Sequence, residues 1–354
     1  MNNDLSQTLQ AEVTEALTNK QTFAIMGGNS KRFLQPANAD KTIHLANHKG
    51  IIDYQASELY ITARAGTPLD EIEALLAQHN QILGSEPPHF SQGSNKATLG
   101  GAIACGFSGS RRPFSGSLRD HVLGVKILNG QGQILSFGGQ VMKNVAGFDV
   151  SRLMVGARGT LGVLLEITLK VIPKPEVETT LRFECLLQNA PQRMADFARM
   201  SLPLSAMAWL EGAVFIRLHG TEQVVRNVQQ KIRGDEILNS PQFWLDLREH
   251  THPFFHSIQP LWRLSVPPAT PLTMPENEVF VDWCGGLRWW HTDKPAEVVN
   301  NMANQAAGYA YLFRDVKPVT GPQPPKALLP LHQQLKKAFD PYGVFNPGIM
   351  GVSS

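Results

Sequence analysis

The chain has 354 residues, of which 42% are hydrophobic and 18% are charged, a globular balance that excludes a disordered protein. Lysine and arginine number 32 against 30 acidic residues, so a formal net charge of +2 gives no basic excess for a dedicated nucleic-acid binder. No apolar run approaches the roughly 18 residues of a membrane span, and the polar first ten residues predict no secretory signal peptide.

Glycine and proline are unevenly distributed along the chain. Of 30 glycines, 20 lie in the first 173 residues, whereas 18 of 24 prolines and all six tryptophans follow. This asymmetry predicts two domains that meet near residues 171–175, although drift in composition between two cores would look similar. The three cysteines, Cys105, Cys185 and Cys284, lie far apart and predict buried thiols in a reducing compartment.

In the first half, periodicity and turn residues predict alternating helices and strands. Thr67 is expected to cap a helix with Pro68 at its first position, and Asn129-Gly130 is expected to supply the positive φ of a hairpin. Alternation over 163–171 predicts a half-buried strand. The predicted elements are a helix over 5–17, strands over 23–26 and 60–63, a helix from 68, a hairpin of 125–128 with 134–137, and a strand over 163–171.

After Pro175 the pattern changes to an antiparallel sheet with helices on one face. A partial continuation of this unit follows, then a Pro-rich connector over 317–325 and a helix over 328–339 that ends before Asp340-Pro341. The other predicted elements are strands over 180–187, around Gly212, over 279–284, 287–290 and 309–313, and helices over 190–200, 223–232 and 295–306.

Four glycine-bearing segments are candidates for contact with a ligand: 26–31, 93–110, 111–121, and 144–149 continued by 156–163. The first is a tight turn whose N–H groups can converge on phosphate, and Ser30 and Lys31 would add a hydroxyl donor and a positive charge. The alternative interpretation is a turn with a purely structural role. The second has so many small residues that we expect a cofactor, not a core, to fill the space. In the third, Arg111 and Arg112 either neutralise a diphosphate or belong to a solvated loop.

These segments occur in an order that resembles the vanillyl-alcohol-oxidase (PCMH-type) FAD-binding family. The motifs that carry the resemblance are GGNS, AGTPLDEIEALLAQH, TLGGAIA, SLRDHVLGV, KNVAGFD, GARGTLGVLLEITLKVIPKP and, near the C-terminus, FDPYGVFNPG. The resemblance implies an α+β fold: a PCMH-type, two-subdomain FAD-binding domain with a smaller antiparallel α+β cap domain. We expect the FAD-binding domain at 1–175, the cap or partner-contacting domain at 176–320, and a C-terminal segment returning to the flavin domain at 321–354.

The resemblance also implies site residues for noncovalently bound FAD, because neither a linking histidine at Asn29 to Lys31 nor a cysteine near 93–101 is present. No catalytic residue and no metal site are assigned. The expected cofactor contacts are Gly27, Gly28, Asn29 and Ser30 on the diphosphate, Thr98, Gly100, Gly101, Ala104 and Ser108 along the pyrophosphate and flavin ring, Asp120 and Val122 along the cofactor, Gly162 and Val163 at the adenosine end, and Asn346 near the isoalloxazine.

Within this family the chain is most similar to the FAD-binding small subunits of bacterial glycolate oxidase (glycolate dehydrogenase) complexes. That similarity implies a cytoplasmic oxidoreductase subunit that oxidises glycolate, with D-lactate as a further substrate, to the 2-oxo acid. Electrons would pass to a larger flavin-containing catalytic subunit and an iron–sulfur subunit, through which any contact with the inner membrane would be made. The alternatives are a self-sufficient FAD-linked 2-hydroxy-acid dehydrogenase and a flavin-free structural subunit.

Three further features have alternative interpretations. His250, His252 and His256 have a metal-like spacing, but Pro253 would interrupt a helix, and a polar loop is the favoured interpretation. The pair Arg314-Asp315 could face the flavin or form a strand-end ion pair. The pair Trp289-Trp290 could belong to a core or to a partner surface.

Overall fold

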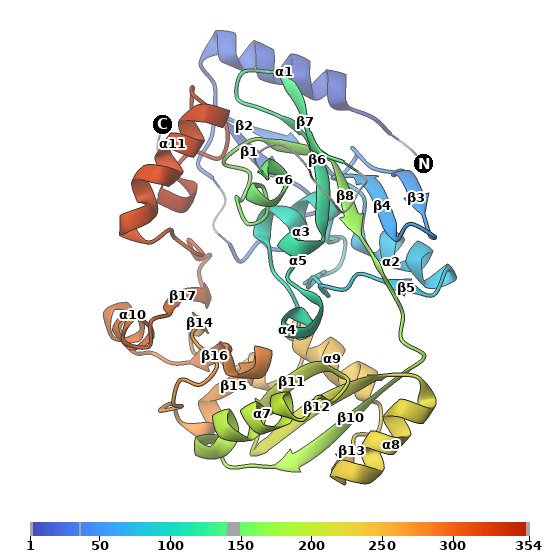
Figure 1. Ribbon diagram of the computed structural model, residues 1–354. Helices are drawn as coiled ribbons and strands as arrows, with labels where there is room; N and C mark the ends of the chain where they lie inside the picture. Colours follow the sequence, from blue (N-terminus) through green and yellow to red (C-terminus); the bar gives the residue numbers. More distant parts are fainter. Residues whose placement is uncertain (1–2, 35–36, 140–148, 352–354) are drawn as a thin grey trace. The chain divides into compact units, whose positions relative to one another are not determined.

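The computed structural model describes residues 3–34, 37–139 and 149–351 (Figure 1). These residues divide into two compact units. The first comprises the described parts of 1–107, 117–174 and 323–354, and the second comprises 108–116 and 175–322. The predicted α+β class is confirmed. Most of the KNVAGFD motif lies outside the described residues.

The first unit is built on a five-stranded sheet of order β3-β4-β8-β6-β7, in which every neighbouring pair is antiparallel. Two smaller pairs accompany it: β1 runs parallel to β2, and β5 runs antiparallel to β9. The strands are β1 Phe23–Met26, β2 Lys41–His44, β3 Ile51–Gln55, β4 Tyr60–Arg64, β5 Gln81–Ile82, β6 Val122–Leu128, β7 Ile134–Gly138, β8 Val163–Lys170 and β9 Ile172–Pro173. The helices are α1 Ser6–Asn19, α2 Leu69–Gln78, α3 Leu99–Cys105, α5 Leu118–His121, α6 Val150–Leu153 and α11 Leu329–Phe339.

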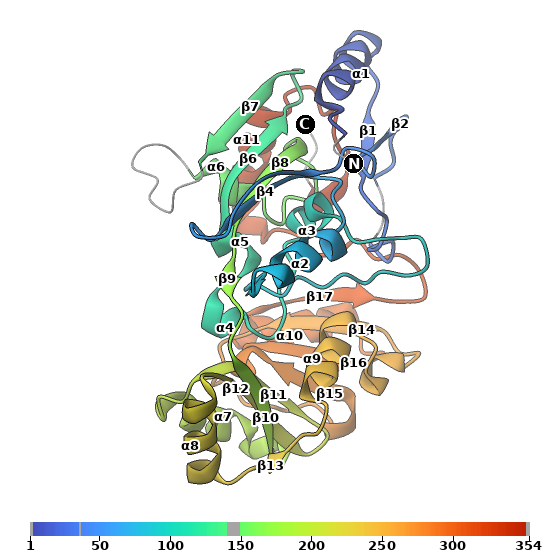
Figure 2. The ribbon, with the colours of Figure 1, turned by 90° about the vertical axis from the view of Figure 1, so that its right-hand side faces the viewer.

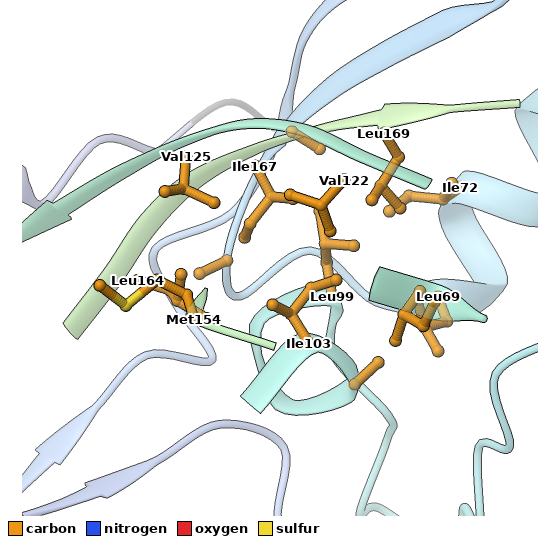
Figure 3. Packing of buried hydrophobic residues seen from close by; sticks show 14 of the residues in the cluster. Leu69, Ile72, Leu99, Ile103, Val122, Val125, Met154, Leu164, Ile167 and Leu169 are labelled. Atoms are coloured by element: carbon orange, nitrogen blue, oxygen red, sulfur yellow. The ribbon is translucent and has the colours of Figure 1, made fainter. Parts of the chain in front are cut away.

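The central strand β8 is buried on both faces, so the prediction of a half-buried strand was wrong. On one face, Ile167 and Leu169 belong to a core with Leu69 of α2 and Ile103 of α3, as Figure 3 shows. Toward the other face, Leu165 belongs to a second core that includes residues of α1. The alternation predicts Val163 and Leu165 on the same face as Ile167 and Leu169. A register shift of β8 against β6 instead separates them, and Val163 and Leu165 lie in the core that includes α1.

Two turns differ from their predictions. The residue that caps α2 is Pro68, not Thr67, whose Oγ1 instead accepts a hydrogen bond of 2.9 Å from the Gly50 N–H. In the hairpin of β6 and β7, the positive φ of +76° belongs to Gly132. The Asn129 carboxamide accepts hydrogen bonds from two N–H groups of the loop, so Asn129 stabilises a turn longer than the predicted one.

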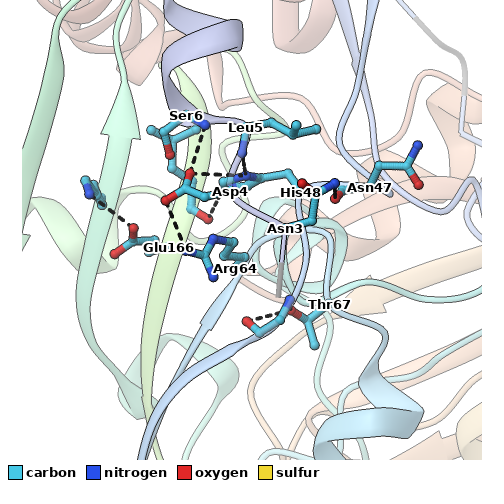
Figure 4. Close-up of polar contacts among 12 residues, drawn as sticks. Asn3, Asp4, Leu5, Ser6, Asn47, His48, Arg64, Thr67 and Glu166 are labelled. Carbon is cyan, nitrogen blue, oxygen red and sulfur yellow. Dashed lines mark hydrogen bonds and ion pairs between the residues drawn. The ribbon is translucent and has the colours of Figure 1, made fainter. Parts of the chain in front are cut away.

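The N-terminal segment is attached to the first unit by a polar cluster (Figure 4). Asp4 accepts hydrogen bonds from the Ser6 N–H at 2.9 Å and from Arg64 Nη2 at 3.0 Å. His48 is fully buried, and its Nδ1 accepts a hydrogen bond of 3.0 Å from the Leu5 N–H. The other ring nitrogen lies 3.0 Å from the Leu165 carbonyl oxygen. The ring is therefore held as the neutral Nε2–H tautomer.

The second unit is built on an eight-stranded sheet of order β13-β10-β12-β11-β15-β16-β14-β17 (Figures 1 and 2). Its paired neighbours are antiparallel. The strands are β10 Val177–Glu184, β11 Leu204–Leu210, β12 Ala213–Gly220, β13 Asp235–Glu236, β14 Leu261–Ser265, β15 Val279–Asp282, β16 Leu287–His291 and β17 Tyr309–Arg314. The helices are α4 Arg112–Ser115, α7 Ala190–Arg199, α8 Glu222–Ile232, α9 Ser240–Glu249 and α10 Ala296–Gln305.

The two faces of this sheet have different partners. Trp209, Trp262 and Trp290 share one core with residues of α7, α8 and α10. Successive strand residues point to opposite faces, so Trp289 lies on the face opposite Trp290. There it contacts the His250 ring just after α9, with ring centroids 4.6 Å apart. Both tryptophans of the pair are buried, which favours the core interpretation over an exposed partner surface. The sequence patterns had not predicted α9 or β14.

Candidate functional site

The first unit contains a cavity of about 390 Å³, within the usual range for small-molecule and cofactor sites. Its wall is formed by β1 and the turn that follows it, one side of α3, the loop before β8, and residues of the C-terminal segment. The predicted site residues that line it are Gly27, Gly28, Asn29, Ser30, Thr98, Gly100, Gly101, Ala104, Gly162 and Asn346.

The turn after β1 requires its glycines because another stretch of backbone lies against it. A Cβ on Gly28 would lie 1.7 Å from the Lys96 carbonyl oxygen, and a Cβ on Gly27 would lie 2.5 Å from Thr98 Oγ1. Asn29 follows with a φ of +58°, a conformation that asparagine tolerates better than most residues. The turn is thus fixed by contact with residues 96–98 and presents its backbone to the cavity.

This turn has unused hydrogen-bond donors. The backbone N–H groups of Gly27, Gly28, Asn29 and Ser30 donate no hydrogen bond to any residue in the described part of the chain. Successive free N–H groups in such a turn form a concavity that suits phosphate oxygens. The Ser30 hydroxyl and the Lys31 ammonium, 3.4 Å apart, lie in the same wall.

Helix α3 lies between the hydrophobic core and the cavity. Thr98 caps it, accepting a hydrogen bond of 3.3 Å from the Gly101 N–H. Leu99 and Ile103 are buried in the core, whereas Gly101 and Ala104 line the cavity. The larger residues of this segment therefore pack into the core, and its small residues leave open the space in which a cofactor was expected.

The cavity wall has a positive charge. Lys31, Arg32 and Arg158 line it, and the described lining residues include no aspartate or glutamate. Such a wall suits an anionic group such as a diphosphate. Arg32 and Arg158 were not among the predicted site residues, although each follows or lies within a quoted glycine motif. Their charge was the signal that could have identified them.

The C-terminal segment closes one side of the cavity through Asn346. Its N–H donates to the Phe23 carbonyl at 2.8 Å, its Oδ1 accepts from the Ile25 N–H at 2.8 Å, and its Nδ2 donates to the Arg158 carbonyl at 2.6 Å. Gly159 allows this contact, since a Cβ there would lie 2.7 Å from Asn346 Nδ2. Asn346 therefore joins β1 to the loop before β8.

A buried ion pair holds the segment that carries Asn346. Lys336 Nζ lies 2.5 Å from Asp340 Oδ2 and also donates to the carbonyl oxygens of Thr160 and Phe345. The Asp340 carboxylate accepts hydrogen bonds from the N–H groups of Val344 and Phe345. Both charged groups thus have several polar partners, as buried charges require.

Four predicted site residues lie elsewhere in the structure. Asp120 forms a capping box with Ser117 at the start of α5, and its bond to the Ser117 N–H is 2.8 Å. Val122 and Val163 are buried in the two cores, and Ser108 groups with the second unit. None of the four is among the described residues that line the cavity.

The arginines of the third glycine segment are engaged within the second unit. Arg111 is buried and pairs with Glu178, while the Arg112 guanidinium lies 4.1 Å from the centre of the Trp283 ring. Arg111 is thus not part of a solvated loop, whereas Arg112 is exposed, as that interpretation expects. At the end of β17, the Arg314 guanidinium lies 5.8 Å from the Phe313 ring centroid, and Asp315 accepts a hydrogen bond from the Val316 N–H.

The histidine motif has aromatic and backbone contacts. The His250 ring stacks on Phe255 with centroids 3.8 Å apart, and His252 Nδ1 accepts a hydrogen bond from the Phe254 N–H. Among the residues that the structure describes, no group of three or more His, Cys, Asp or Glu side chains is placed to hold a metal ion. Over the same residues, no helix combines the length and apolar character needed to cross a bilayer.

The residues present fit FAD in three respects: free N–H groups, cationic side chains, and an otherwise small and apolar wall. Cys105 also lines the cavity, and burial raises the pKa of its thiol. A protonated thiol is a poor nucleophile. The described lining residues include no histidine.

Comparison with known proteins agrees with this site. The family described as "FAD binding domain" matches residues 5–138. The glycolate oxidase subunit GlcE of Escherichia coli (strain K12) is 44% identical over 351 residues, which cover 98% of this chain and 97% of that protein. The glycolate oxidase subunit GlcD of Bacillus subtilis (strain 168) is 32% identical over 171 residues, covering 40% of this chain and 36% of that protein.

Among solved structures, an alkyldihydroxyacetonephosphate synthase matches 96% of this chain and 75% of its own chain with a TM-score of 0.69. The sequence identity is only 14%, so this likeness shows the fold alone. The match to GlcE over nearly the full length of both chains is far stronger evidence of homology than the structural likeness. The chain belongs to the family of FAD-dependent oxidoreductases that includes the glycolate oxidase subunit GlcE.

Proposed function

We propose that this chain is the FAD-binding subunit of a multi-subunit glycolate dehydrogenase. The observation that carries the proposal is the 44% identity to GlcE over nearly the whole of both chains. The cavity supports it, because its wall combines free N–H groups with cationic side chains. The substrate class is a small 2-hydroxy acid: glycolate, with D-lactate as a further candidate, oxidised to the 2-oxo acid.

In this proposal the turn Gly27 to Ser30 holds the FAD diphosphate through its N–H groups, with Lys31 and Arg158 balancing the charge. Gly101 and Ala104 leave room beside α3, and Asn346 fixes the wall opposite. The bound flavin would supply the capacity to accept a hydride from the carbon that carries the substrate hydroxyl. The protein's part is to bind the cofactor, to orient it and to limit the access of water.

We propose that the flavin is held noncovalently. The raised pKa of Cys105 and the absence of histidine among the described lining residues support this. Acid precipitation should release all the flavin into the supernatant, and the denatured chain should show no flavin fluorescence on a gel. Fluorescence that stays with the chain would contradict noncovalent binding.

We further propose that a larger flavin-containing subunit oxidises the substrate and that an iron–sulfur subunit receives the electrons. The described lining residues of the cavity include no histidine, aspartate or glutamate to act as a general base, which supports catalysis chiefly in the larger partner. We place the complex in the cytoplasm, with any contact with the inner membrane made through the partners.

The decisive experiment combines flavin analysis with reconstitution. The chain should bind FAD when purified alone, reduce a dye with glycolate only when the partner subunits are present, and lose flavin on Gly101→Trp with its fold retained. Gly139→Trp is the matched control, because a Cβ at Gly139 meets no atom of the described residues within 4 Å. A colourless wild-type chain would support a flavin-free structural subunit. Dye reduction by the isolated chain would support a self-sufficient dehydrogenase.

A further inference from the structure

Helix α11 has an inverted pattern of burial. Of its 11 residues, all within the described part of the chain, the buried one is Lys336, whereas Leu331 is 53% exposed. Leu335 and Phe339 pack partly against the first core, and the Phe339 ring lies 6.3 Å, between centroids, from that of Phe137 on β7. The helix is therefore anchored by its lysine and by its inner residues, while apolar side chains remain on its outer side.

The exposed apolar side chains of the first unit are concentrated in this C-terminal segment. Among the residues that the structure describes, four large apolar side chains of this unit are exposed. Three of them are Leu328, Leu331 and Tyr342, with exposed fractions of 47%, 53% and 68%; the fourth, Ile52, lies on β3. A single exposed apolar residue is common on a protein surface, but several in one segment indicate an interaction surface.

The spacing of these residues places most of them along one side of α11, which lies at the margin of the first unit (Figure 1). Leu331 and the exposed Ala338 are seven residues apart, about two helical turns, and so lie on the same side. Leu328 ends the short helix that leads into α11, and Tyr342 follows the end of α11. Leu328, Leu331, Ala338 and Tyr342 are called here the α11 face.

The exposed charges of this segment have one sign. Lys326 and Lys337 are exposed, and neither forms an ion pair with any residue that the structure describes. Between residues 323 and 351 the sequence contains a single acidic residue, Asp340, which is fully buried against Lys336. The α11 face therefore combines apolar side chains with positive charge that no exposed carboxylate of the same segment balances.

A protein surface of complementary charge fits this face best. Apolar contacts supply affinity at an interface, and complementary charges at its rim select the partner. Pairing with the same face of a second copy would bring like charges together. Helices that bind a membrane surface usually carry many cations on their polar side, whereas this helix exposes one, Lys337.

We propose that the α11 face binds an apolar surface, flanked by carboxylates, on a partner subunit. The proposal rests on the proposed function for the existence of that subunit, and it is supported by the description of the relative GlcE as a subunit of glycolate oxidase. The Lys336–Asp340 pair holds α11 in place before binding, so little conformational entropy is lost when the partner binds.

The first test is cross-linking of the full-length chain after co-purification with the larger flavin-containing subunit and the iron–sulfur subunit. A carbodiimide joins a lysine amine directly to a carboxylate that contacts it. We expect mass spectrometry to find Lys326 or Lys337 joined to an aspartate or glutamate of one partner. Cross-links to the partners from other lysines, with none from these two, would overturn the proposal.

The second test measures the affinity of variants for the same partner subunits. Leu331→Glu should weaken binding by roughly tenfold or more, because it places a carboxylate among apolar contacts and opposite the partner's carboxylates. Lys337→Glu should weaken it less, since charges at a rim contribute less than buried contacts. Leu331→Ala keeps the test valid if Leu331→Glu does not fold, and it should weaken binding by roughly threefold or more.

The matched control is Ile52→Glu, because Ile52 is the exposed apolar residue of the same unit that lies outside this segment. It should bind the partners as the wild type does. All these variants should keep their flavin, since none of the substituted residues is among the described residues that line the cavity.

Unchanged affinity in the Leu331 variants would overturn this inference and leave the proposed function intact. A wild-type complex that does not oxidise glycolate would refute the proposed function and leave the α11 face assigned. A wild-type chain that binds neither partner subunit would refute both. Dimerisation of the isolated chain, or its binding to phosphatidylglycerol vesicles, would also overturn the inference if Leu331→Glu abolished it without changing the affinity for the partners.

Discussion

The cavity of the first unit and the aromatic sheet face of the second unit, which carries Arg263, Trp283, Trp289 and Tyr311, are built in opposite ways. In the first, side chains are missing: Gly27 and Gly28 place backbone against backbone, and free N–H groups form the recognition surface. In the second, side chains are large, and a single guanidinium is surrounded by three aromatic rings.

The difference explains why glycine is concentrated in one half of the chain and tryptophan in the other. A backbone site depends on the exact position of turns, so it is sensitive to any added atom. A ring-lined face depends on packed side chains, so it is sensitive to any removed atom. Four substitutions test this contrast.

The largest effect is expected for Trp289→Ala, compared with Trp290→Ala on the opposite face of the same strand. Both side chains are buried, so each truncation should reduce the free energy of unfolding by roughly 3–5 kcal/mol. Trp289→Ala removes ring contacts with His250 and Phe313 on one face of the sheet, whereas Trp290→Ala removes packing in the core on the other face. Chemical denaturation measures both losses. A negligible loss in either variant would show that its ring does not support the packing on that face.

Nearly as large an effect is expected for Lys336→Met in the first unit. The substitution leaves the fully buried Asp340 carboxylate without its cation, which typically costs about 3–5 kcal/mol. The segment that carries Asn346 should loosen, and the ratio of flavin to protein should fall. Lys337→Met is the matched control, because Lys337 is the exposed neighbour on the same helix. An unchanged unfolding midpoint for Lys336→Met would argue against the anchoring role of the pair.

A smaller effect is expected for Gly28→Ala. The added methyl would lie 1.7 Å from the Lys96 carbonyl oxygen, so the turn must move, at a cost of roughly 1–3 kcal/mol. Gly101→Ala is the milder comparison, because its methyl would lie 3.1 Å from the Thr98 hydroxyl. Flavin content and thermal unfolding should rank wild type first, then Gly101→Ala, then Gly28→Ala. The reverse order of the two variants would contradict a site built on backbone contact.

The sequence predicted the backbone site better than the ring-lined face. Glycine motifs have a fixed order, and the sequence identifies the turn Gly27 to Ser30, Gly101 and Asn346, all of which line the cavity. Helix α3 was missed, because its small residues hid the Leu99 and Ile103 positions that pack it into the core.

The aromatic sheet face of the second unit has no comparable signal in the sequence. Arg263, Trp289 and Tyr311 come from three strands, and only the register of the sheet places them side by side. The strand β14 itself was not predicted, because five residues give too few repeats for alternation to be evident. Burial of Val122 and Val163 likewise depends on helices that cover both faces of the first sheet, which local patterns do not specify.

The smallest expected effect concerns pH and involves His48, a buried residue of the first unit that is not among the described residues lining the cavity. Burial lowers the pKa of His48, with Asp4, Arg64 and Glu166 as the charged groups nearest to it. The folded state then binds fewer protons than the unfolded state, so stability is lost as pH falls below the usual histidine value of 6.5. Each pKa unit by which folding lowers the pKa of a histidine corresponds to about 1.4 kcal/mol in the free energy of unfolding.

His48→Gln should reduce this acid sensitivity, because a glutamine amide can accept from the Leu5 N–H and donate to the Leu165 carbonyl but does not titrate. Urea denaturation between pH 7.5 and pH 5 measures the difference in slope between wild type and variant. Asp4 does not titrate in this pH range, because hydrogen bonds from Ser6 hold its pKa well below its usual 3.8. Its contribution to the free energy of unfolding is therefore lost only at lower pH. Identical slopes would mean that other depressed histidines, such as His250 or His291, dominate the response. In that case the acid-sensitive part of the protein would be the aromatic face of the second unit, not the N-terminal attachment of the first.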